Sequence, residues 1–340
     1  MSSLTERTPT SPPIIAPVTN QAYRPLWSVM IPIYNCLGYL QKTLSSVLAQ
    51  DPGPELMQIA VIDDCSSDGD VWALVQQLGK GRVEYFRQEQ NRGSLRNFET
   101  CLNCSRGHWV HLLHGDDWVA SGFYAEIARL FQDHPEAGAA FTHNVHFTVN
   151  TTGETELVER IPFAKKAGIA QNFLLRIAEN QKLETPSIVV KRSVYEQLGS
   201  FFAVHYGEDW EMWARIAAHF PIAYSPMRLS YYRTHHTSIT QRSLETGQNV
   251  RDIMKVIDII QGYLPIEQQK RLKKTARRYY ALYCMYLAHR LYDAQPETNQ
   301  AVAFIQAKGA VAMSKDVKVI YSALKLYCKY FILHKRLKNL

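Results

Sequence analysis

The sequence predicts an α/β fold in which a mostly parallel sheet is flanked by helices and followed by a helical C-terminal extension. Apolar, β-branched runs alternate with stretches of helical periodicity between residues 27 and 113, a succession typical of parallel strands joined by crossover helices. Two of these runs end in a pair of aspartates. From about Val250 the sequence turns helical, tyrosine-rich and basic, with no further strand pattern.

The elements follow in order from these patterns. Residues 1–25 are rich in Ser, Thr and Pro, lack the charged and apolar regions of a signal peptide, and are predicted to be a disordered lead. In the first half, strands are expected at 27–34, 57–62, 82–86 and 109–113, and helices at 40–48, 71–78 and 94–103. In the second half, strands are expected at 139–148 and 188–191, a helix at 208–218 and an extended segment at 222–232.

Length and composition indicate one large domain with an appendage. The 340 residues are divided into the lead at 1–25, a main domain at 26–245 and a basic helical extension at 246–340. The six cysteines are irregularly spaced and include a single CxxC, at Cys101 and Cys104. This spacing predicts neither a disulfide framework nor a zinc site, and a reducing cytoplasm is the expected setting.

Charge is concentrated at the C-terminal end. From Lys270 onward there are 15 Lys or Arg and 3 Asp or Glu, a net charge of +12; because the whole chain carries +7, residues 1–269 carry −5. A basic tail on an acidic body indicates an anionic partner for the tail, such as phospholipid, nucleic acid or an acidic protein.

The candidate chemistry lies in carboxylates at strand ends. The sequence has no GxGxxG after a strand and no GxxxxGK[ST], which argues against an NAD-type site and a P-loop NTPase. Asp116 and Asp117 follow the run 109–113, and two adjacent carboxylates repel each other unless a cation or hydrogen-bond donors compensate. A solvated turn that caps the next helix is the alternative.

Two further carboxylate sites have both a structural and a functional interpretation. Asp63 and Asp64 begin a turn that either only caps the next helix or accepts hydrogen bonds from a nucleoside. Asp209 shares a helix face with Met212 and Trp213, where the helix dipole and desolvation act in opposite directions on its pKa. That environment suits a general base, although Asp209 could merely cap the helix.

Six motifs together resemble the family 2 glycosyltransferases, which have the GT-A fold. The resemblance covers about residues 27–240 and rests on Ser28-Val-Met-Ile-Pro-Ile-Tyr-Asn35, Val61-Ile-Asp-Asp-Cys-Ser-Ser-Asp-Gly69, Asn91-Arg-Gly-Ser-Leu-Arg-Asn97, His114-Gly-Asp-Asp-Trp118, Gly207-Glu-Asp-Trp210 and Arg233-Thr-His235. Their order and spacing are similar to those of the family. His114 departs from it, since many relatives carry an acidic residue at this position.

The resemblance implies a role for each matching residue. Pro32, Tyr34 and Asp64 would contact the nucleoside, and Arg96 would lie near the base and phosphates. Asp117 would ligate Mg²⁺ or Mn²⁺, and Asp116 would meet the ribose or the metal. Asp209 would be the catalytic base. His235 would meet the diphosphate or the metal.

The activity that the resemblance implies is sugar transfer with inversion. A nucleotide-diphosphate sugar would donate the sugar, and a hydroxyl of a glycan or lipid-linked acceptor in bacterial cell-surface polysaccharide synthesis would receive it. The chain lacks the QxxRW element and the transmembrane spans that usually accompany processive members, so one sugar per encounter is expected. The enzyme is expected in the cytoplasm, at the inner face of the plasma membrane.

The tail leaves two interpretations open. Lys318, Ser322, Lys325, Lys329 and Arg336 form one stripe on a helix, which suits a helix lying in the interface of an anionic membrane. Alternatively, the broad apolar side packs on the body of the protein or on a second subunit. A catalytically silent nucleotide-sugar binding module and a nucleic-acid binder that uses the tail are the competing functions; the helical spacing of the tail tyrosines disfavours the second.

Overall fold

The computed structural model describes residues 7–19, 24–149, 155–159, 161–235, 238–294 and 296–338, and the chain divides into two compact units. The first, here the sheet unit, comprises residues up to His235 apart from two short segments. The second, here the helical unit, comprises His236–Leu340 together with those segments, Leu174–Gln181 and Val204–Gly207. The division thus falls at residue 235, whereas the sequence patterns place it near 245.

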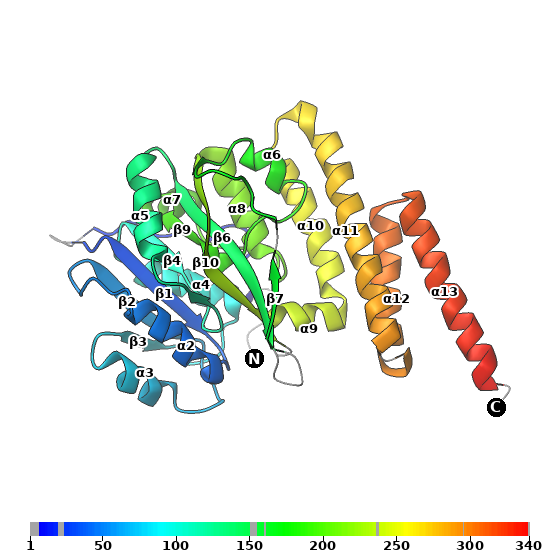
Figure 1. Cartoon of the computed structure of the whole chain (residues 1–340), viewed down its shortest axis with the longest axis horizontal. Coiled ribbons are helices and arrows are strands. Elements are labelled where there is room, and N and C mark those ends of the chain that lie inside the picture. The colour runs from blue at the N-terminus through cyan, green and yellow to red at the C-terminus, as the bar shows by residue number, and fades with distance from the viewer. Residues whose placement is uncertain are drawn as a thin grey trace. The chain divides into compact units, whose positions relative to one another are not determined.

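The first half of the sheet unit is the parallel α/β arrangement that the sequence predicts (Figure 1). Its strands run in the order β3-β2-β1-β4. Their bounds are β1 Trp27–Ile33, β2 Met57–Asp63, β3 Glu84–Arg87 and β4 Trp109–Leu112, and the helices between them are α2 Leu37–Leu48, α3 Val71–Gly79 and α4 Ser94–Cys104. The register pairs Trp27 with Met57 and Ile33 with Asp63, so β1 and β2 end at the same edge of the sheet.

The second half of the sheet unit makes the sheet mixed. Strand β9 (Ile188–Lys191) pairs antiparallel with both β4 and β6 (Ala139–Val149), and β10 (Ile222–Thr234) pairs parallel with β6. The other elements of this unit are β5 Trp118–Val119, α5 Phe123–Asp133, β7 Thr155–Glu159, β8 Gly168–Ile169, the 3₁₀ turn η1 Thr185–Ser187, α7 Arg192–Leu198 and α8 Glu208–His219. The short helix α6 (Phe173–Ile177) belongs to the helical unit from Leu174 onward. The sequence analysis did not predict α5, although its apolar residues recur at helical spacing.

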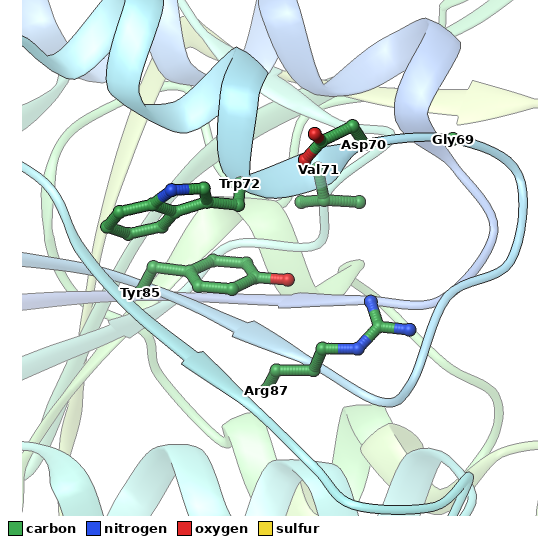
Figure 2. A pocket seen from close by; sticks show the side chains of 6 residues that line it. All are labelled: Gly69, Asp70, Val71, Trp72, Tyr85 and Arg87. Atoms are coloured by element: carbon green, nitrogen blue, oxygen red, sulfur yellow. The ribbon is translucent and has the colours of Figure 1, made fainter.

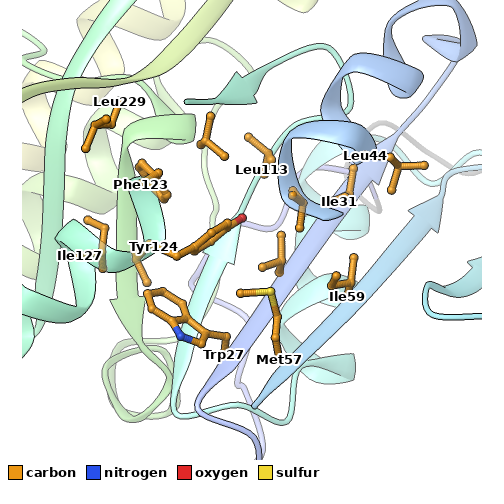
Figure 3. Packing of buried hydrophobic residues seen from close by; sticks show 14 of the residues in the cluster. Trp27, Ile31, Leu44, Met57, Ile59, Leu113, Phe123, Tyr124, Ile127 and Leu229 are labelled. Atoms are coloured by element: carbon orange, nitrogen blue, oxygen red, sulfur yellow. The ribbon is translucent and has the colours of Figure 1, made fainter. Parts of the chain in front are cut away.

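The core of the sheet unit joins β1 and β2 to the helices that flank them. Figure 3 shows Trp27, Ile31 and Met57 packed together, with Phe123 and Ile127 of α5 on the same cluster. Fully burying one such side chain contributes roughly 1.5–3 kcal/mol, so this cluster fixes the strands whose ends carry the aspartates.

Part of the N-terminal lead is packed, contrary to the expected disorder at 1–25. The carbonyl of Pro9 accepts a hydrogen bond from Ala203 N, and that of Pro13 accepts one from Ser200 N. Ile15 is fully buried. Residues 7–19 therefore lie on the sheet unit, because their apolar side chains and backbone acceptors find partners distant in sequence; residues 1–6 and 20–23 lie outside the described residues.

The helical unit confirms the expected helical C-terminal region. Its helices are α9 Ile239–Thr246, α10 Gln248–Gln261, α11 Ile266–Ala294, α12 Pro296–Met313 and α13 Val317–Lys338. Asn249 and Gln306, both fully buried, exchange two side-chain hydrogen bonds of 3.1 and 2.7 Å between α10 and α12. Within the part of the chain that the structure describes, no helix is both long and apolar enough to cross a bilayer.

Candidate active site

The loop after β1 brings Pro32 and Tyr34 to the edge of the sheet. Pro32 is buried and its carbonyl accepts a hydrogen bond from Gly115 N, whereas Tyr34 is 44% exposed. Asn35, which has a φ of 50°, holds this loop against the next one through its side chain, which accepts from Ser67 N at 2.8 Å. Tyr34 is therefore the accessible side chain of the predicted pair.

The side chains of Asp63, the last residue of β2, and of Asp64, which follows it, both accept hydrogen bonds from the protein's own loops and strands. Asp64 is buried; Oδ2 accepts from Gly93 N at 2.8 Å and from Asn91 Nδ2 at 2.7 Å, and Oδ1 accepts from Arg92 N at 2.7 Å. Burial raises the pKa of Asp64, while the bonds from Arg92 and Gly93 act in the opposite direction. Asp64 thus positions the loop that leads into α4.

A surface hollow lies between the start of α3 and strand β3. It is lined by Gly69, Asp70, Val71, Trp72, Tyr85 and Arg87 (Figure 2). The Tyr85 hydroxyl and Arg87 Nη1 donate to Asp63 Oδ2 at 2.7 and 2.6 Å. Burial and the bond to Asp63 raise the pKa of Tyr85 to about 12. These polar groups support the end of β2.

Arg96 lies in the first turns of α4. Its Nη1 contacts Glu99 Oε2 at 2.7 Å, one turn further along the same helix, and both side chains are partly exposed. The loop that Asp64 holds runs directly into this helix, so Asp64 and Arg96 belong to one local segment.

Asp116 and Asp117 follow β4 in a loop whose conformation requires glycine at position 115. A Cβ atom added to Gly115 would lie 2.4 Å from Ile33 Cγ2 and 2.9 Å from Cys36 Sγ. Thr43 of α2 closes the loop, because its hydroxyl contacts the carbonyl oxygens of Gly115 at 2.9 Å and Asp117 at 2.6 Å. Close packing against β1 and α2 thus turns both carboxylates to this edge of the sheet.

His114, Asp116 and Asp117 form a cluster whose possible ligand atoms all lie within 4.8 Å of one another. Asp117 is 1% exposed, and its Oδ1 accepts a hydrogen bond from Arg233 N at 2.8 Å. Its Oδ2 lies 4.0 Å from His114 Nδ1 and, among the described residues, accepts no hydrogen bond. A buried carboxylate oxygen without a donor is costly, and a bound cation would compensate it.

The environment of this cluster shifts the pKa values of the two aspartates in opposite directions. Burial and the neighbouring charge of Asp116 raise the pKa of Asp117 well above its ordinary value, and Glu184 adds to this. Burial also acts to raise the pKa of Asp116, but the hydrogen bond from His235 and the charge of His114 outweigh it, so that pKa is lowered. Burial lowers the pKa of His114, which favours the neutral imidazole.

His235 reaches the cluster through Asp116. Its Nε2 lies 2.8 Å from Asp116 Oδ2, and its ring is 4.7 Å from that of Tyr39, centroid to centroid. The structure therefore brings together Asp116, Asp117 and His235, as the order of the motifs suggests. The direct contact of His235 is with Asp116.

Two residues at this site were given no role in the sequence analysis, Arg233 and Glu184. The Arg233 guanidinium lies 4.8 Å from the Tyr39 ring and 4.9 Å from that of Trp118, and its Nε donates to the Asp116 carbonyl at 3.0 Å. Glu184 is largely buried, and its charge acts on both Asp117 and His114. No local motif marks Glu184, whereas Arg233 stands in the same motif as His235.

Asp209 lies in the first turn of α8, after Gly207, whose φ is 87°. It is half-buried, and Trp210 and Trp213 beside it are buried. Its Oδ1 accepts from Trp210 N at 2.8 Å. Asp209 thus lies within the first turn of α8 and not before the helix.

Comparison of the sequence with models of protein families identifies the family of the domain that holds this cluster. The sequence model of glycosyl transferase family 2 matches residues 28–194. Residues 28–194 are a family 2 glycosyltransferase domain. The match contains β2, β4, all of β1 except Trp27, and the His114–Asp117 loop, and four of the six motifs lie within it. The family resemblance is thereby confirmed, while the motifs at 207–210 and 233–235 lie beyond the matched residues.

Curated relatives of this chain come from several bacteria. An uncharacterised protein of Mycobacterium tuberculosis is 28% identical over 244 residues, which cover 69% of this chain and 75% of the relative. The minor teichoic acid biosynthesis protein GgaB of Bacillus subtilis is 28% identical over 135 residues, which cover 38% of this chain and 15% of GgaB.

Solved structures show the same GT-A fold. Residues 1–349 of S. aureus TarS, in a complex with UDP-GlcNAc, have a TM-score of 0.60 at 16% identity, and the match covers 88% of this chain and 89% of that TarS fragment. A mannosyltransferase of Pyrobaculum calidifontis, bound to GDP-Man and Mn²⁺, has a TM-score of 0.56 at 20% identity, covering 97% of this chain and 86% of that one. The expected fold class is thereby confirmed.

Proposed function

We propose that this glycosyltransferase moves one sugar per encounter from a nucleotide-diphosphate sugar to an acceptor hydroxyl, with inversion at the anomeric carbon. The observation that carries the proposal is Asp117 Oδ2, a buried carboxylate oxygen without a hydrogen-bond donor among the described residues, beside Asp116 at the end of β4. Strand ends of this kind are where α/β sheets bind their ligands.

The residues of the cluster fit a divalent cation, Mg²⁺ or Mn²⁺. Asp117 offers a carboxylate oxygen, and His114 offers an imidazole that its environment keeps neutral. When bound, the ion would supply positive charge opposite the departing diphosphate. The resemblance assigns His235 to the metal or the diphosphate; its contact with Asp116 supports a role in orienting that carboxylate toward the ribose or the ion.

The nucleoside would lie along the ends of β1 and β2. Tyr34 offers an exposed ring and Pro32 a fixed strand end. Asp64 would act mainly by fixing the loop that contains Asn91 and Gly93. Arg96 on α4 would supply positive charge near the base and phosphates.

Asp209 would be the general base. Its carboxylate takes the proton of the acceptor hydroxyl, the hydroxyl oxygen forms a bond to the anomeric carbon, and the bond from that carbon to the diphosphate oxygen breaks. The nucleoside diphosphate leaves with the bonding electron pair. General-base catalysis of this kind typically accelerates a reaction 10²–10⁴-fold.

The acceptor would be a glycan or a lipid-linked glycan precursor of the bacterial envelope. Support comes from the name of GgaB, which is a teichoic acid biosynthesis protein, and from the separation of charge between residues 1–269 and the basic tail. Such an acceptor would place the enzyme at the inner face of the plasma membrane.

A donor screen tests the proposal. Thermal unfolding of the full chain is followed with Mn²⁺ and with UDP-, GDP- or dTDP-sugars, because a bound donor raises the apparent stability by mass action. One donor class should raise the midpoint only when the metal is present, and that donor should then be hydrolysed slowly. Binding without any hydrolysis would indicate the silent binding module, and salt-dependent binding to nucleic acid in place of donors would indicate the third function.

A further inference from the structure

The last helix of the chain presents an apolar stripe to solvent. Val317, Tyr321, Leu324 and Phe331 of α13 are between 59% and 81% exposed. They stand at offsets of 0, 4, 7 and 14, so they share one face of the helix. Ordinary surface helices direct such residues inward, and an exposed stripe of this length indicates an interaction surface.

The other side of α13 explains why the stripe faces outward. Val319, Ala323 and Leu326 are buried in the helical unit. His289 Nε2 of α11 lies 3.0 Å from the Ser322 hydroxyl, and Lys329 Nζ lies 2.8 Å from Asp293 Oδ1. Because α13 already has an apolar buried face and polar ties to α11, the exposed stripe is a second apolar face rather than a loosely packed core face.

The charge of α13 restricts what could cover the stripe. Residues 317–338 contain six Lys or Arg and no Asp or Glu. Lys318 and Lys325 adjoin the stripe on the helix surface. A second copy of the helix would place like charges together, which disfavours pairing, whereas an anionic surface is complementary to the helix. Lysine side chains can also lay their methylene stems on an apolar layer while the ammonium group stays in water.

We propose that α13 lies in the interface of an anionic phospholipid bilayer, with the stripe Val317–Tyr321–Leu324–Phe331 among the acyl chains and Lys318 and Lys325 at the headgroups. At about 1.5 Å per residue, the stripe is about 21 Å long and suits a helix parallel to the membrane plane. This inference deepens the proposed function. The membrane contact is argued from α13 alone, and only its role, delivery of the enzyme to a lipid-linked acceptor, rests on the proposed function.

Co-sedimentation with vesicles tests the surface directly. The full chain is mixed with vesicles of phosphatidylcholine alone or with about 30% phosphatidylglycerol. We expect at least tenfold stronger partitioning to the anionic vesicles, weakening as salt screens the lysines. The partitioning of the triple variant Tyr321→Ser, Leu324→Ser, Phe331→Ser to the same anionic vesicles should be at least tenfold weaker than that of the parent. The matched control is Ile266→Ser, which removes an 85% exposed apolar side chain of the same unit.

The lysines are tested by a second pair of variants. The double variant Lys318→Gln, Lys325→Gln should reduce the preference for anionic lipid several-fold, while Lys308→Gln, at an exposed lysine of α12, should leave it unchanged. Parent-like vesicle binding by the triple variant overturns the proposal. So does a concentration-dependent dimer of the parent that the triple variant loses, since the stripe would then cover a second copy. Donor binding, measured on the same proteins, should not change, so failure of the membrane surface and failure of the proposed function give different results.

Discussion

The backbone N–H of Arg233 donates a 2.8 Å hydrogen bond to Asp117 Oδ1, which joins the end of β10 to the loop after β4. This bond fixes one carboxylate oxygen of Asp117 and leaves Oδ2 directed toward His114. The candidate metal site is therefore oriented before any ligand binds, and such preorganisation lowers the cost of binding.

His114 should be a direct ligand of the metal. We expect electron-spin-echo spectroscopy of Mn²⁺ bound to the protein with a nucleoside diphosphate to show ¹⁴N coupling from imidazole. His114→Asp should remove the coupling while Mn²⁺ still binds, and it should shift selectivity toward Mg²⁺, which prefers oxygen ligands. His235→Asn is the control and should keep the coupling. Persistence of the signal in His114→Asp, together with its loss in His235→Asn, would assign the nitrogen ligand to His235 and rule His114 out.

Metal binding should strengthen as pH rises. Burial and Asp116 raise the pKa of Asp117 above its ordinary 3.8, so without metal this carboxyl holds its proton to higher pH than a free carboxyl does. Bound metal must displace that proton. Without metal, the stability contributed by the protonated form is lost as pH rises through the raised pKa, and with metal it is recovered. The increase in unfolding temperature caused by Mn²⁺ should therefore grow from about pH 4 upward; an increase independent of pH would contradict this.

Gly115→Ala should damage the site through packing. The new Cβ would meet the side chains of Ile33 and Cys36 at distances that require these side chains or the loop to shift, and overpacking of this kind typically costs 1–3 kcal/mol. Donor binding should weaken along with stability. Gly38→Ala, in α2 with open space around it, is the matched control and should stabilise the fold by roughly 0.5–1 kcal/mol. Denaturant unfolding of both variants measures the difference, and equal stabilities would show that the loop tolerates a side chain.

Asp209→Asn should separate chemistry from binding. The amide keeps the shape of the side chain but cannot take a proton, so we expect donor affinity close to that of the parent and transfer or donor hydrolysis at least about 10²-fold slower. Single-turnover measurement with radiolabelled donor reports the chemical step. A parent-like rate would assign the base to another residue, and Glu184 would be the first to test.

Local patterns explain what could be predicted from the sequence. The apolar runs of β2 and β4 and the aspartate pairs at their ends are encoded within a few residues, so both the strands and the position of Asp116 and Asp117 follow from periodicity. The contact of Asp116 with His235 joins residues 119 positions apart, and only the order of family motifs suggested it. Glu184 lies in a turn without a motif of its own, and its closeness depends on how β9 is inserted between β4 and β6.

The packed part of the N-terminal lead, residues 7–19, shows what amino-acid composition does not predict. Its composition of Ser, Thr and Pro is typical of disorder, yet the carbonyls of Pro9 and Pro13 find donors at Ala203 and Ser200. Proline lacks an N–H but keeps its carbonyl acceptor, so such a segment can lie along a folded unit without forming a strand. Composition alone does not reveal those partners.

Calorimetric titration of the donor into Asp117→Ala tests the central claim most directly, because Asp117 is the residue through which metal and donor would be linked. With the donor class identified by the thermal screen, the parent should bind in the presence of Mn²⁺ and lose most of its affinity in EDTA. The variant should bind weakly in both conditions, since the cation has lost its carboxylate ligand. Full donor affinity in the variant, insensitive to EDTA in both proteins, would contradict the account.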